Sequence, residues 1–482
     1  MPSPAPDGDL YVASRCVRDG TVLEVREPWS NAPLGRVVLA DAAHAEEAVA
    51  ASVRAFERLR ATTRYERKVL LGRVAHQIDS RREAFAELIA REAGKPIVLA
   101  RAEVERAVTT FELAAEEAIR MGGEVMPLDV TPTSGRATGT WVRVPAGPVV
   151  GIGPFNFPLN LVAHKIAPAI ACGASIVLKP PPQTPLTSLL LAQCVRRAGA
   201  PDDCVQVVPC AVDVAEALVR DDRFATLSFT GSAAVGWRLK SIAGKKRVLL
   251  ELGGNAATIV HEDAAFGVAI ERVVSGAFGY AGQVCIKVQR LYVHRTIADR
   301  FVTELVNRSR TIEPRSPLDP AALCGPMIDE ANARRVEQWV HEAVEAGARV
   351  ACGGRREGNR YWPTVIEVEG AGRGLKVVDE EVFGPVLTVH RYDTWEEALT
   401  MADGTRYGLQ AGVFTDSHAR IEQAFRRLHV GGLIVNDTPT FRVDAMPYGG
   451  TRDSGLGREG VRFAMEEMTE RKLLVVHELP SG

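Results

Sequence analysis

Short apolar segments alternate with helical stretches from residue 147 to residue 260, and this alternation constrains the fold more than any other feature of the chain. Strands separated by helices form parallel sheets with helices on both faces. The pattern recurs after residue 260, so two doubly wound, Rossmann-like α/β lobes are expected, with a boundary near residue 257. The expected strands are 149–152, 175–178, 205–208, 227–229 and 248–250, and then 291–294, 386–389, 411–414 and 432–435.

The rest of the chain divides into helices and an excursion of short β segments. Apolar residues at helical spacing predict helices over 44–60, 64–92 and about 97–121. Glycines and prolines punctuate the β-prone segment 123–145, which is typical of a hairpin that leaves the lobe. The tail 472–477 is an apolar strand that needs a partner edge, and another subunit could supply it.

Composition excludes several classes of function. The net charge of −2 gives no electrostatic reason to expect nucleic acid or an anionic membrane as a partner. The N-terminus lacks the basic and apolar regions of a signal peptide, and no apolar run approaches the ~20 residues that span a bilayer. We therefore expect a cytoplasmic protein. The 8 cysteines form no CxxC pair and the histidines form no cluster, so no metal site is predicted.

One cysteine is set apart by its neighbours. Cys285 ends the glycine-rich stretch FGYAGQVC, and a cysteine behind such an approach can be a nucleophile that solvent reaches. Glu251 ends an apolar strand 34 residues upstream, where its carboxylate can serve as a base that activates water. A nucleophile and a base are the minimum apparatus for covalent chemistry at a carbonyl carbon. An enzyme that forms a thiol adduct is therefore expected.

Other segments place functional side chains beside the ends of expected strands, where open α/β sheets bind ligands. Asn156 could donate to an oxyanion, Lys179 could bind ribose or phosphate, and the helix start at Ser232 could attract pyrophosphate. Glu381 could accept bonds from ribose hydroxyls while Phe383 packs on a flat ring. Taken singly, these segments are also compatible with a local turn, a solvated lysine, an ordinary capped helix and a hydrophobic plug.

The chain resembles the aldehyde dehydrogenase superfamily in six motifs that follow one another in order: PFNFPL, LKPPPQTP, FTGS, ELGGN, GQVC and EVFGP. The resemblance extends from GKP (94–96) to PYGGTRDSGLGR (447–458). The residues within these motifs are most similar to those of the non-phosphorylating glyceraldehyde-3-phosphate and lactaldehyde dehydrogenases. The domains that this resemblance implies are a dinucleotide-binding domain (1–122 and 146–257), a catalytic domain (258–457) and oligomerisation elements (123–145 and 458–482).

The resemblance also implies a mechanism and a cofactor site. The Cys285 thiolate would add to an aldehyde, and the Asn156 side chain and the Cys285 amide would hold the oxyanion. A hydride would pass to a nicotinamide ring, and Glu251 would activate the water that releases a carboxylate. Lys165 would support Asn156 and Glu251. The implied cofactor contacts are Ile152, Pro154, Phe155, Lys179, Gly231, Ser232, Leu252, Glu381 and Phe383.

Two departures from the family pattern affect the ligands. Many relatives have a glutamate in Lys-Pro-x-Glu that would clasp the ribose and repel a 2′-phosphate, but this chain has Pro182 there, so the cofactor is expected to be NADP, NAD or both. Val284 replaces the arginine that often precedes the nucleophile when the substrate carries phosphate. Arg106 and Arg442 could still hold an anionic substrate group, or they could form surface salt bridges.

A small-molecule aldehyde is the expected partner, and the hairpin and tail predict a homodimer or homotetramer. Two alternatives stay open at this stage. A coenzyme A-acylating semialdehyde dehydrogenase would pass the acyl group to a thiol, although the intact ELGG favours hydrolysis. A non-catalytic binding protein could keep the fold without the chemistry.

Overall fold

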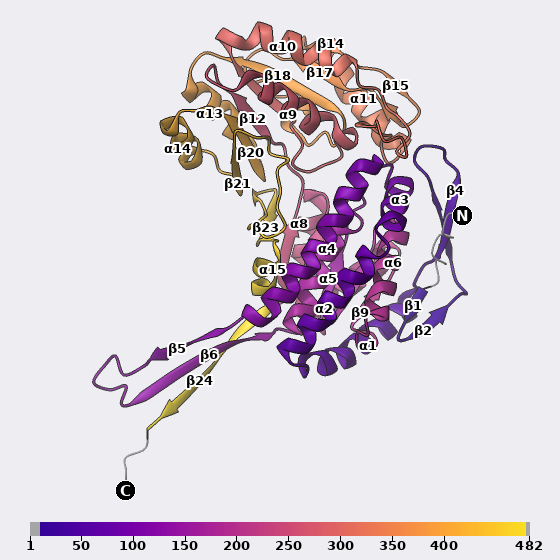
Figure 1. The fold of residues 1–482 in the computed structure, drawn as a ribbon, viewed down its shortest axis with the longest axis vertical. Coiled ribbons are helices and arrows are strands. Elements are labelled where there is room, and N and C mark those ends of the chain that lie inside the picture. The colour runs from indigo at the N-terminus through magenta and orange to yellow at the C-terminus, as the bar shows by residue number, and fades with distance from the viewer. Residues whose placement is uncertain (1–9, 479–482) are drawn as a thin grey trace.

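A computed structural model describes residues 10–478, and its ribbon forms two lobes and a protruding arm (Figure 1). Both lobes contain a mainly parallel sheet with helices, which confirms the predicted α/β class. Residues 1–9, on which the signal-peptide prediction depends, lie outside the described residues. Within 10–478, no helix has the length and apolar character that a membrane span requires.

The first lobe is built on a six-stranded sheet of order β9-β8-β7-β10-β11-β23, parallel except for β23. The chain moves outward from β7 in both directions, so β7 and β10 flank the switch point at which such sheets bind ligands. The strands are β7 (Val149–Ile152), β8 (Ile176–Lys179), β9 (Val205–Val207), β10 (Thr226–Thr230), β11 (Arg247–Glu251) and β23 (Gly455–Leu456).

Both faces of this sheet are buried. Val149 and Ile176 pack into a core with α2–α6, whereas the next residues, Val150 and Val177, pack into a core with α1, α7 and α8. Burial on both faces explains why these strands read as uninterrupted apolar runs. The helices are α1 (Ala42–Arg60), α2 (Arg64–Asp79), α3 (Arg82–Ala93), α4 (Ile97–Arg120), α5 (Asn160–Cys172), α6 (Pro185–Arg197), α7 (Val212–Arg220) and α8 (Ala233–Ile242).

The predicted helix 64–92 is wrong in its continuity, because α2 ends at Asp79 and α3 begins at Arg82. Arg81, between them, has φ −122° and ψ 22°, which is outside the helical range. Both helices pack on α4, so the apolar spacing continues across the break and hides it.

The second lobe carries a seven-stranded sheet of order β14-β17-β18-β13-β12-β20-β21, in which only β14 is antiparallel. Strands β12, β14 and β17 were absent from the predicted set. The strands are β12 (Ala257–Val260), β13 (Arg290–His294), β14 (Arg349–Cys352), β17 (Thr364–Glu367), β18 (Val386–Tyr392), β20 (Gln410–Phe414) and β21 (Gly432–Val435). The helical elements are α9 (Phe266–Phe278), η1 (Gly279–Gly282), α10 (Arg295–Arg310), α11 (Glu330–Glu345), α12 (Lys376–Asp379), α13 (Trp395–Asp403) and α14 (His418–Arg427).

The arm is a three-stranded antiparallel sheet that extends away from the first lobe (Figure 1). It contains the predicted hairpin, β5 (Gly123–Pro127) and β6 (Ala137–Pro145), together with the tail strand β24 (Thr469–His477). The expectation that another subunit pairs with the tail is wrong for this edge, because β24 pairs with β6 of the same chain. The hairpin leaves one edge of β6 free, and the tail returns to occupy it.

The chain crosses back to the first lobe before the arm. β23 pairs with β11, and α15 (Val461–Glu467) packs on α4 and α5. The predicted ranges 258–457 and 458–482 do not anticipate this return, because a two-residue strand gives no sequence signal. The remaining short strands are β1 (Leu10–Val12), β2 (Arg15–Val17), β3 (Val22–Arg26), β4 (Pro33–Val38), β15 (Arg356–Glu357), β16 (Arg360–Tyr361), β19 (Tyr407–Gly408) and β22 (Thr451–Arg452).

Candidate active site

The carboxyl edge of the first sheet gathers most of the residues predicted to contact a cofactor. β7 ends at Ile152 and leads into the turn with Pro154 and Phe155, and β10 leads through Gly231 to Ser232 at the start of α8. Ser232 makes no side-chain capping hydrogen bond. The amides of the first turn of α8 are therefore not satisfied by this residue.

Two more predicted contacts lie on the same edge. Lys179 ends β8, is half-buried, and its side chain has no hydrogen bond or ion pair with another described residue. Burial lowers the pKa of Lys179, which suits a site that a polar ligand completes. Leu252 follows β11 and is buried against α8, where a Cβ on Gly236 would lie 2.3 Å from it.

The second lobe faces this edge with loops that precede its strands. Phe383 lies before β18, and its ring meets Phe155 of the first lobe edge-on, with 5.8 Å between ring centroids. Glu381 accepts a hydrogen bond of 3.0 Å from the Gly254 amide. Burial raises the pKa of Glu381 to about 7.

The loop that carries Cys285 follows a tight path. It begins with η1, whose two middle residues have positive φ. Gly282 also has positive φ, and a Cβ there would lie 2.3 Å from the Gly384 carbonyl oxygen, so glycine is required at this position. The conformation presents Cys285 at the N-terminal side of β13, toward the first lobe.

Asn156 and Cys285 are brought together by this path. The Asn156 side-chain amide donates a hydrogen bond of 2.9 Å to the carbonyl of Gln283, two residues before the cysteine. The Cys285 side chain is half-buried, and its Sγ lies 3.2 Å from the Tyr448 hydroxyl. Burial raises the pKa of the Cys285 thiol to about 12, and the hydrogen bond with Tyr448 opposes the rise.

Glu251 lies at the end of β11, and neither oxygen of its carboxyl group has a hydrogen-bond partner among the described residues. A Cβ on Gly449 would lie 2.8 Å from one of these oxygens, so a glycine makes room for the carboxyl group. Burial and the negative charge of Glu459 raise the pKa of Glu251 well above its ordinary range. Its charge also affects the pKa of Cys285, which places the two groups in one electrostatic site.

Lys165 is fully buried on α5, and its ammonium group pairs with Glu459 at 3.1 Å. It also donates to the hydroxyls of Thr230 at 2.7 Å and Ser228 at 3.2 Å, both on β10. It forms no hydrogen bond with Asn156 or Glu251, although its positive charge opposes the rise in the pKa of Glu251. Lys165 therefore acts on the site through its charge and through Glu459.

Arg442 is buried, so the surface salt bridge considered for it does not exist. Its guanidinium donates to Glu459 at 3.2 Å and lies 3.7 Å from the centre of the Tyr448 ring. Its Nε has no partner among the described residues. Burial opposes the ionisation of Glu459, but the cations around it, Lys165 first among them, hold its pKa at about 2.

Arg106 is partly exposed and forms a two-pronged ion pair with Asp444, at 2.7 Å and 3.1 Å. The same carboxylate contacts His164 at 2.8 Å and Asn160 at 3.0 Å. Arg106 thus pairs with a residue two positions after Arg442, and each arginine already has a carboxylate partner.

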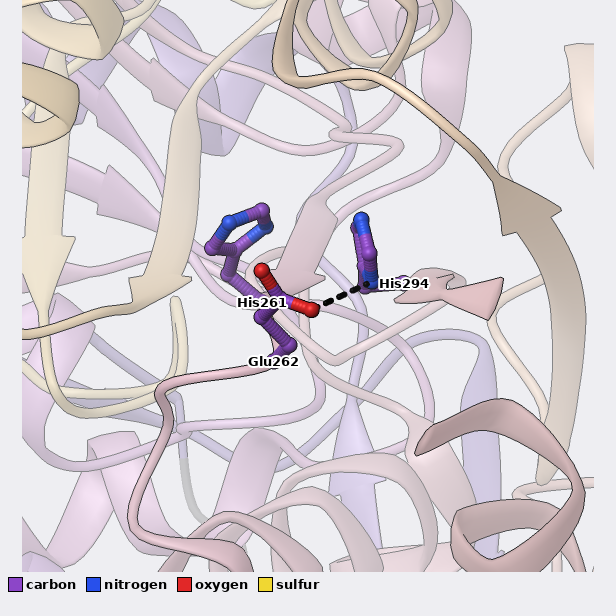
Figure 2. A group of neighbouring side chains, drawn as sticks. All are labelled: His261, Glu262 and His294. Atoms are coloured by element: carbon purple, nitrogen blue, oxygen red, sulfur yellow. Dashed lines mark ion pairs between the residues drawn. The ribbon is translucent and has the colours of Figure 1, made fainter. Parts of the chain in front are cut away.

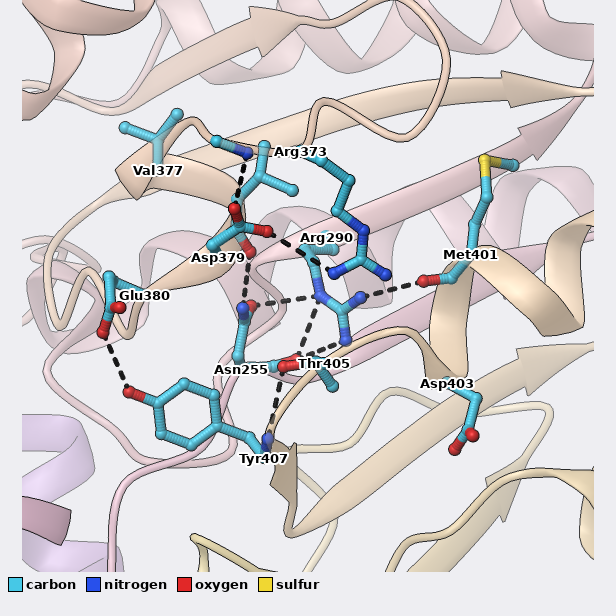
Figure 3. A network of polar contacts seen from close by, with 12 residues as sticks. Asn255, Arg290, Arg373, Val377, Asp379, Glu380, Met401, Asp403, Thr405 and Tyr407 are labelled. Carbon is cyan, nitrogen blue, oxygen red and sulfur yellow. Dashed lines mark hydrogen bonds and ion pairs between the residues drawn. The ribbon is translucent and has the colours of Figure 1, made fainter.

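Sequence reasoning missed Tyr448 and Glu459, both in or next to PYGGTRDSGLGR, whose resemblance gave them no individual role. It also missed the bracing around Asn255, next to Gly254 (Figure 3). The buried Arg290 donates to the Asn255 carbonyl at 2.8 Å, and the Asn255 amide donates to Val378 at 2.5 Å. A Cβ on Gly254 would lie 2.3 Å from the Cys285 carbonyl oxygen, so this bracing supports the cysteine loop.

A histidine cluster was not expected, but the second sheet assembles one at its carboxyl edge (Figure 2). His261 and His294 follow Val260 and Val293, which are paired on β12 and β13. The two histidines and Glu262 could offer ligand atoms within 4.8 Å of one another. In the structure His261 bonds Tyr392 at 2.8 Å, and His294 lies 3.5 Å from Glu262.

Comparisons with known proteins agree with this geometry. The family model described as "Aldehyde dehydrogenase family" matches residues 16–474. The chain is 41% identical over 469 residues to 3-sulfolactaldehyde dehydrogenase of Priestia aryabhattai, covering 97% of this chain and 98% of that enzyme. The structure of aldehyde dehydrogenase 21 from Physcomitrella patens, in complex with the reaction product succinate, matches at 39% identity with a TM-score of 0.95, over 98% of this chain and 99% of that one.

A second solved structure, glyceraldehyde-3-phosphate dehydrogenase GapN from Methanocaldococcus jannaschii complexed with NADP, is 36% identical. Its TM-score is 0.91, and the match covers 96% of this chain and all of that one, 100%. The predicted resemblance is confirmed by the family match and by these relatives. The chain belongs to the aldehyde dehydrogenase family.

Proposed function

We propose that this aldehyde dehydrogenase uses NADP or NAD to oxidise small anionic or hydroxylated aldehydes to the free carboxylic acids. The observation that carries the proposal is the convergence of the Cys285 thiol, the Asn156 amide and the unpaired Glu251 carboxyl between the two lobes. The relatives named above act on sulfolactaldehyde, yield succinate or bind NADP, which supports the same class of substrate and cofactor.

The chain's own residues would carry the covalent steps. The Cys285 thiolate attacks the aldehyde carbon, and the Asn156 side chain and the Cys285 amide donate hydrogen bonds to the resulting oxyanion. When the oxyanion collapses, the acyl group remains on the sulfur as a thioester. Glu251 then takes a proton from water, and the hydroxide releases the carboxylate and restores the thiol. Lys165, through Glu459, sets the charge around this base.

The residues on the carboxyl edge of the first sheet fit a nicotinamide dinucleotide, which when bound would accept the hydride. The first-turn amides of α8 at Ser232, with Gly231 before them, suit a pyrophosphate. The unpaired Lys179 suits ribose hydroxyls or a phosphate. Ile152, Pro154, Phe155, Leu252, Glu381 and Phe383 would complete the contacts. No carboxylate stands at Pro182 to repel a 2′-phosphate, so NADP is accommodated.

Arg442 and Arg106 would hold the anionic group of the substrate. Arg442 is buried within contact of Tyr448, which itself touches Cys285, and its Nε is free for a ligand. Arg106 is partly exposed, so it would act nearer the entrance. A charge-assisted hydrogen bond is stronger than a neutral one, so a sulfonate or carboxylate substrate would gain the most from these cations.

The test is a panel of aldehydes that pairs anionic with neutral compounds of similar size, with NADP or NAD, followed by the absorbance of the reduced cofactor. Arg106→Met should raise KM for the anionic members by about tenfold relative to the neutral ones. The matched control is Arg101→Met, which removes an exposed arginine from the same helix. Equal losses for anionic and neutral aldehydes would overturn the substrate assignment, and turnover that requires coenzyme A would overturn the hydrolytic one.

A homodimer or homotetramer is also proposed, with the arm as its contact. Leu473, Leu474 and Val476 on β24 expose apolar side chains that a second subunit could cover.

A further inference from the structure

The contact that the proposed mechanism leaves unused is the one between Tyr448 and the reacting sulfur. Among the described residues, the Tyr448 hydroxyl is the sole hydrogen-bond partner of the Cys285 Sγ, at 3.2 Å. The sulfur is likewise the sole partner of that hydroxyl. A tyrosine at this position therefore adds a polar atom to a wall that is otherwise apolar, where Ile286 and Leu409 pack beside it.

The position of Tyr448 is fixed through its backbone and through one face of its ring. Its backbone exchanges two hydrogen bonds with Glu459, of 3.0 Å and 2.6 Å. The Arg442 guanidinium covers one face of the ring at 3.7 Å, and Glu459 in turn fixes Arg442 at 3.2 Å. The side chain is 2% exposed, so solvent does not compete for the hydroxyl. The hydroxyl is thus preorganised toward Cys285.

We propose, on the basis of the function proposed above, that Tyr448 is a further catalytic residue, whose hydroxyl donates a hydrogen bond to the Cys285 thiolate and stabilises it before attack. In the neutral pair either atom can donate, but once the thiol has lost its proton only the hydroxyl can. Burial raises the pKa of Tyr448 well above its ordinary range, so the phenol keeps its proton and transfers none. The guanidinium above the ring favours the electron density that this bond places on the phenol, which makes the hydroxyl a better donor.

The Cys285 thiolate needs a stabilising partner. The Cys285 thiol is half-buried, and among the described residues no cation lies in direct contact with its ionised form. A hydrogen bond to a charged sulfur in such surroundings is strong, and removing it should raise the pKa of the thiol by about one unit, equivalent to about tenfold in the thiolate fraction. As the sulfur commits its electron pair to carbon, the bond weakens and the hydroxyl stays neutral.

The experiment compares the wild-type enzyme with Tyr448→Phe, which keeps the ring under Arg442. The rate at which iodoacetamide alkylates Cys285 is measured against pH without cofactor or substrate, by mass spectrometry of the peptide that contains Cys285. The expected result is alkylation about tenfold slower at each pH below the pKa of the thiol, which is equivalent to a rise of about one unit in that pKa. Tyr361→Phe is the matched control, because that hydroxyl is buried with no partner among the described residues and packs in a different cluster from Tyr448.

A second measurement separates catalysis from packing. In Tyr448→Phe, kcat/KM should fall by the same factor as the alkylation rate, about tenfold, an agreement that a packing defect would not produce. An unchanged alkylation profile would overturn the proposal. A shifted profile in an enzyme that oxidises no aldehyde would overturn the proposed function instead and leave the role of Tyr448 toward the thiol intact.

Discussion

The two lobes share an alternation of strands and helices, but they present opposite edges of their sheets to the candidate site. The first lobe offers its carboxyl edge, where Lys179 and Glu251 end strands. The second lobe offers the loops that precede its strands, and Cys285 and Glu381 lie in two of them. The rule that open α/β sheets bind ligands at their carboxyl edges therefore locates only half of this site.

The carboxyl edge of the second sheet lies outside the candidate site, and its histidines already have protein contacts. There His261 bonds the Tyr392 hydroxyl, and His294 bonds the Thr296 hydroxyl. His294 also lies 3.5 Å from Glu262 (Figure 2), and a polar ligand would have to displace these contacts.

On the first sheet, Lys179 and both oxygens of Glu251 have no partner among residues 10–478. The second edge also keeps buried polar atoms without a partner among the described residues, His261 Nε2 and Asp263 Oδ1, so unsatisfied polar groups alone do not mark the site. The first edge is set apart because the loops that carry Cys285 and Glu381 face it.

The largest loss of activity should come from replacing Cys285, which the second lobe contributes. Cys285→Ala removes the atom that forms the covalent bond, so aldehyde oxidation should fall on the order of 10³-fold or more. Cofactor binding, measured by fluorescence quenching, should stay close to that of the wild type because the first lobe is untouched. Cys16→Ser changes an exposed cysteine and is the control. If Cys285→Ala kept more than about one hundredth of the wild-type turnover, Cys285 would not be the nucleophile.

The next effect should come from the first lobe's base. Glu251→Gln should lower steady-state kcat by about 10²- to 10³-fold, because water is no longer activated. A rapid burst of reduced cofactor, up to one per active site, should remain, since the thioester forms before the base acts. The pKa of Glu251 is raised, so its carboxylate form, and with it the wild-type rate of hydrolysis, should increase as the pH rises. Stopped-flow absorbance measures both, and the absence of a burst would place Glu251 in an earlier step.

The sequence motifs name individual candidate site residues, whereas they leave the borders of the fold imprecise. Residues such as Cys285, Asn156 and Glu251 lie in motifs whose family resemblance is specific, so they could be named without coordinates. The arrangement around them could not be named. Lys165 pairs with Glu459 because the chain returns to the first lobe at β23, and a strand of two residues cannot be predicted from the sequence. Packing on a shared helix also hid the break between α2 and α3.

A smaller effect is expected on the preference for NADP over NAD when a charge is added at the carboxyl edge of the first sheet. Pro182 is exposed at the position where many relatives have glutamate, so Pro182→Glu places a carboxylate near the expected ribose. This variant should raise KM for NADP relative to NAD by about tenfold through repulsion of the 2′-phosphate. Initial rates with both cofactors measure the ratio, and Gln183→Glu, at the next exposed position, is the control. An unchanged ratio would mean that the 2′-position lies elsewhere.

The smallest effect on activity should come from the carboxyl edge of the second sheet. His261→Ala removes the 2.8 Å bond to Tyr392 from a residue that is 3% exposed, so the free energy of unfolding should fall by about 1–3 kcal/mol. Thermal unfolding measures this loss, and His341→Ala, at an exposed position on α11, should be neutral. Because this edge faces away from the loops that carry Cys285, kcat should stay within about twofold of the wild type. A tenfold loss of kcat with unchanged stability would mean that the second sheet, too, uses its carboxyl edge for function, and the contrast between the lobes would fail.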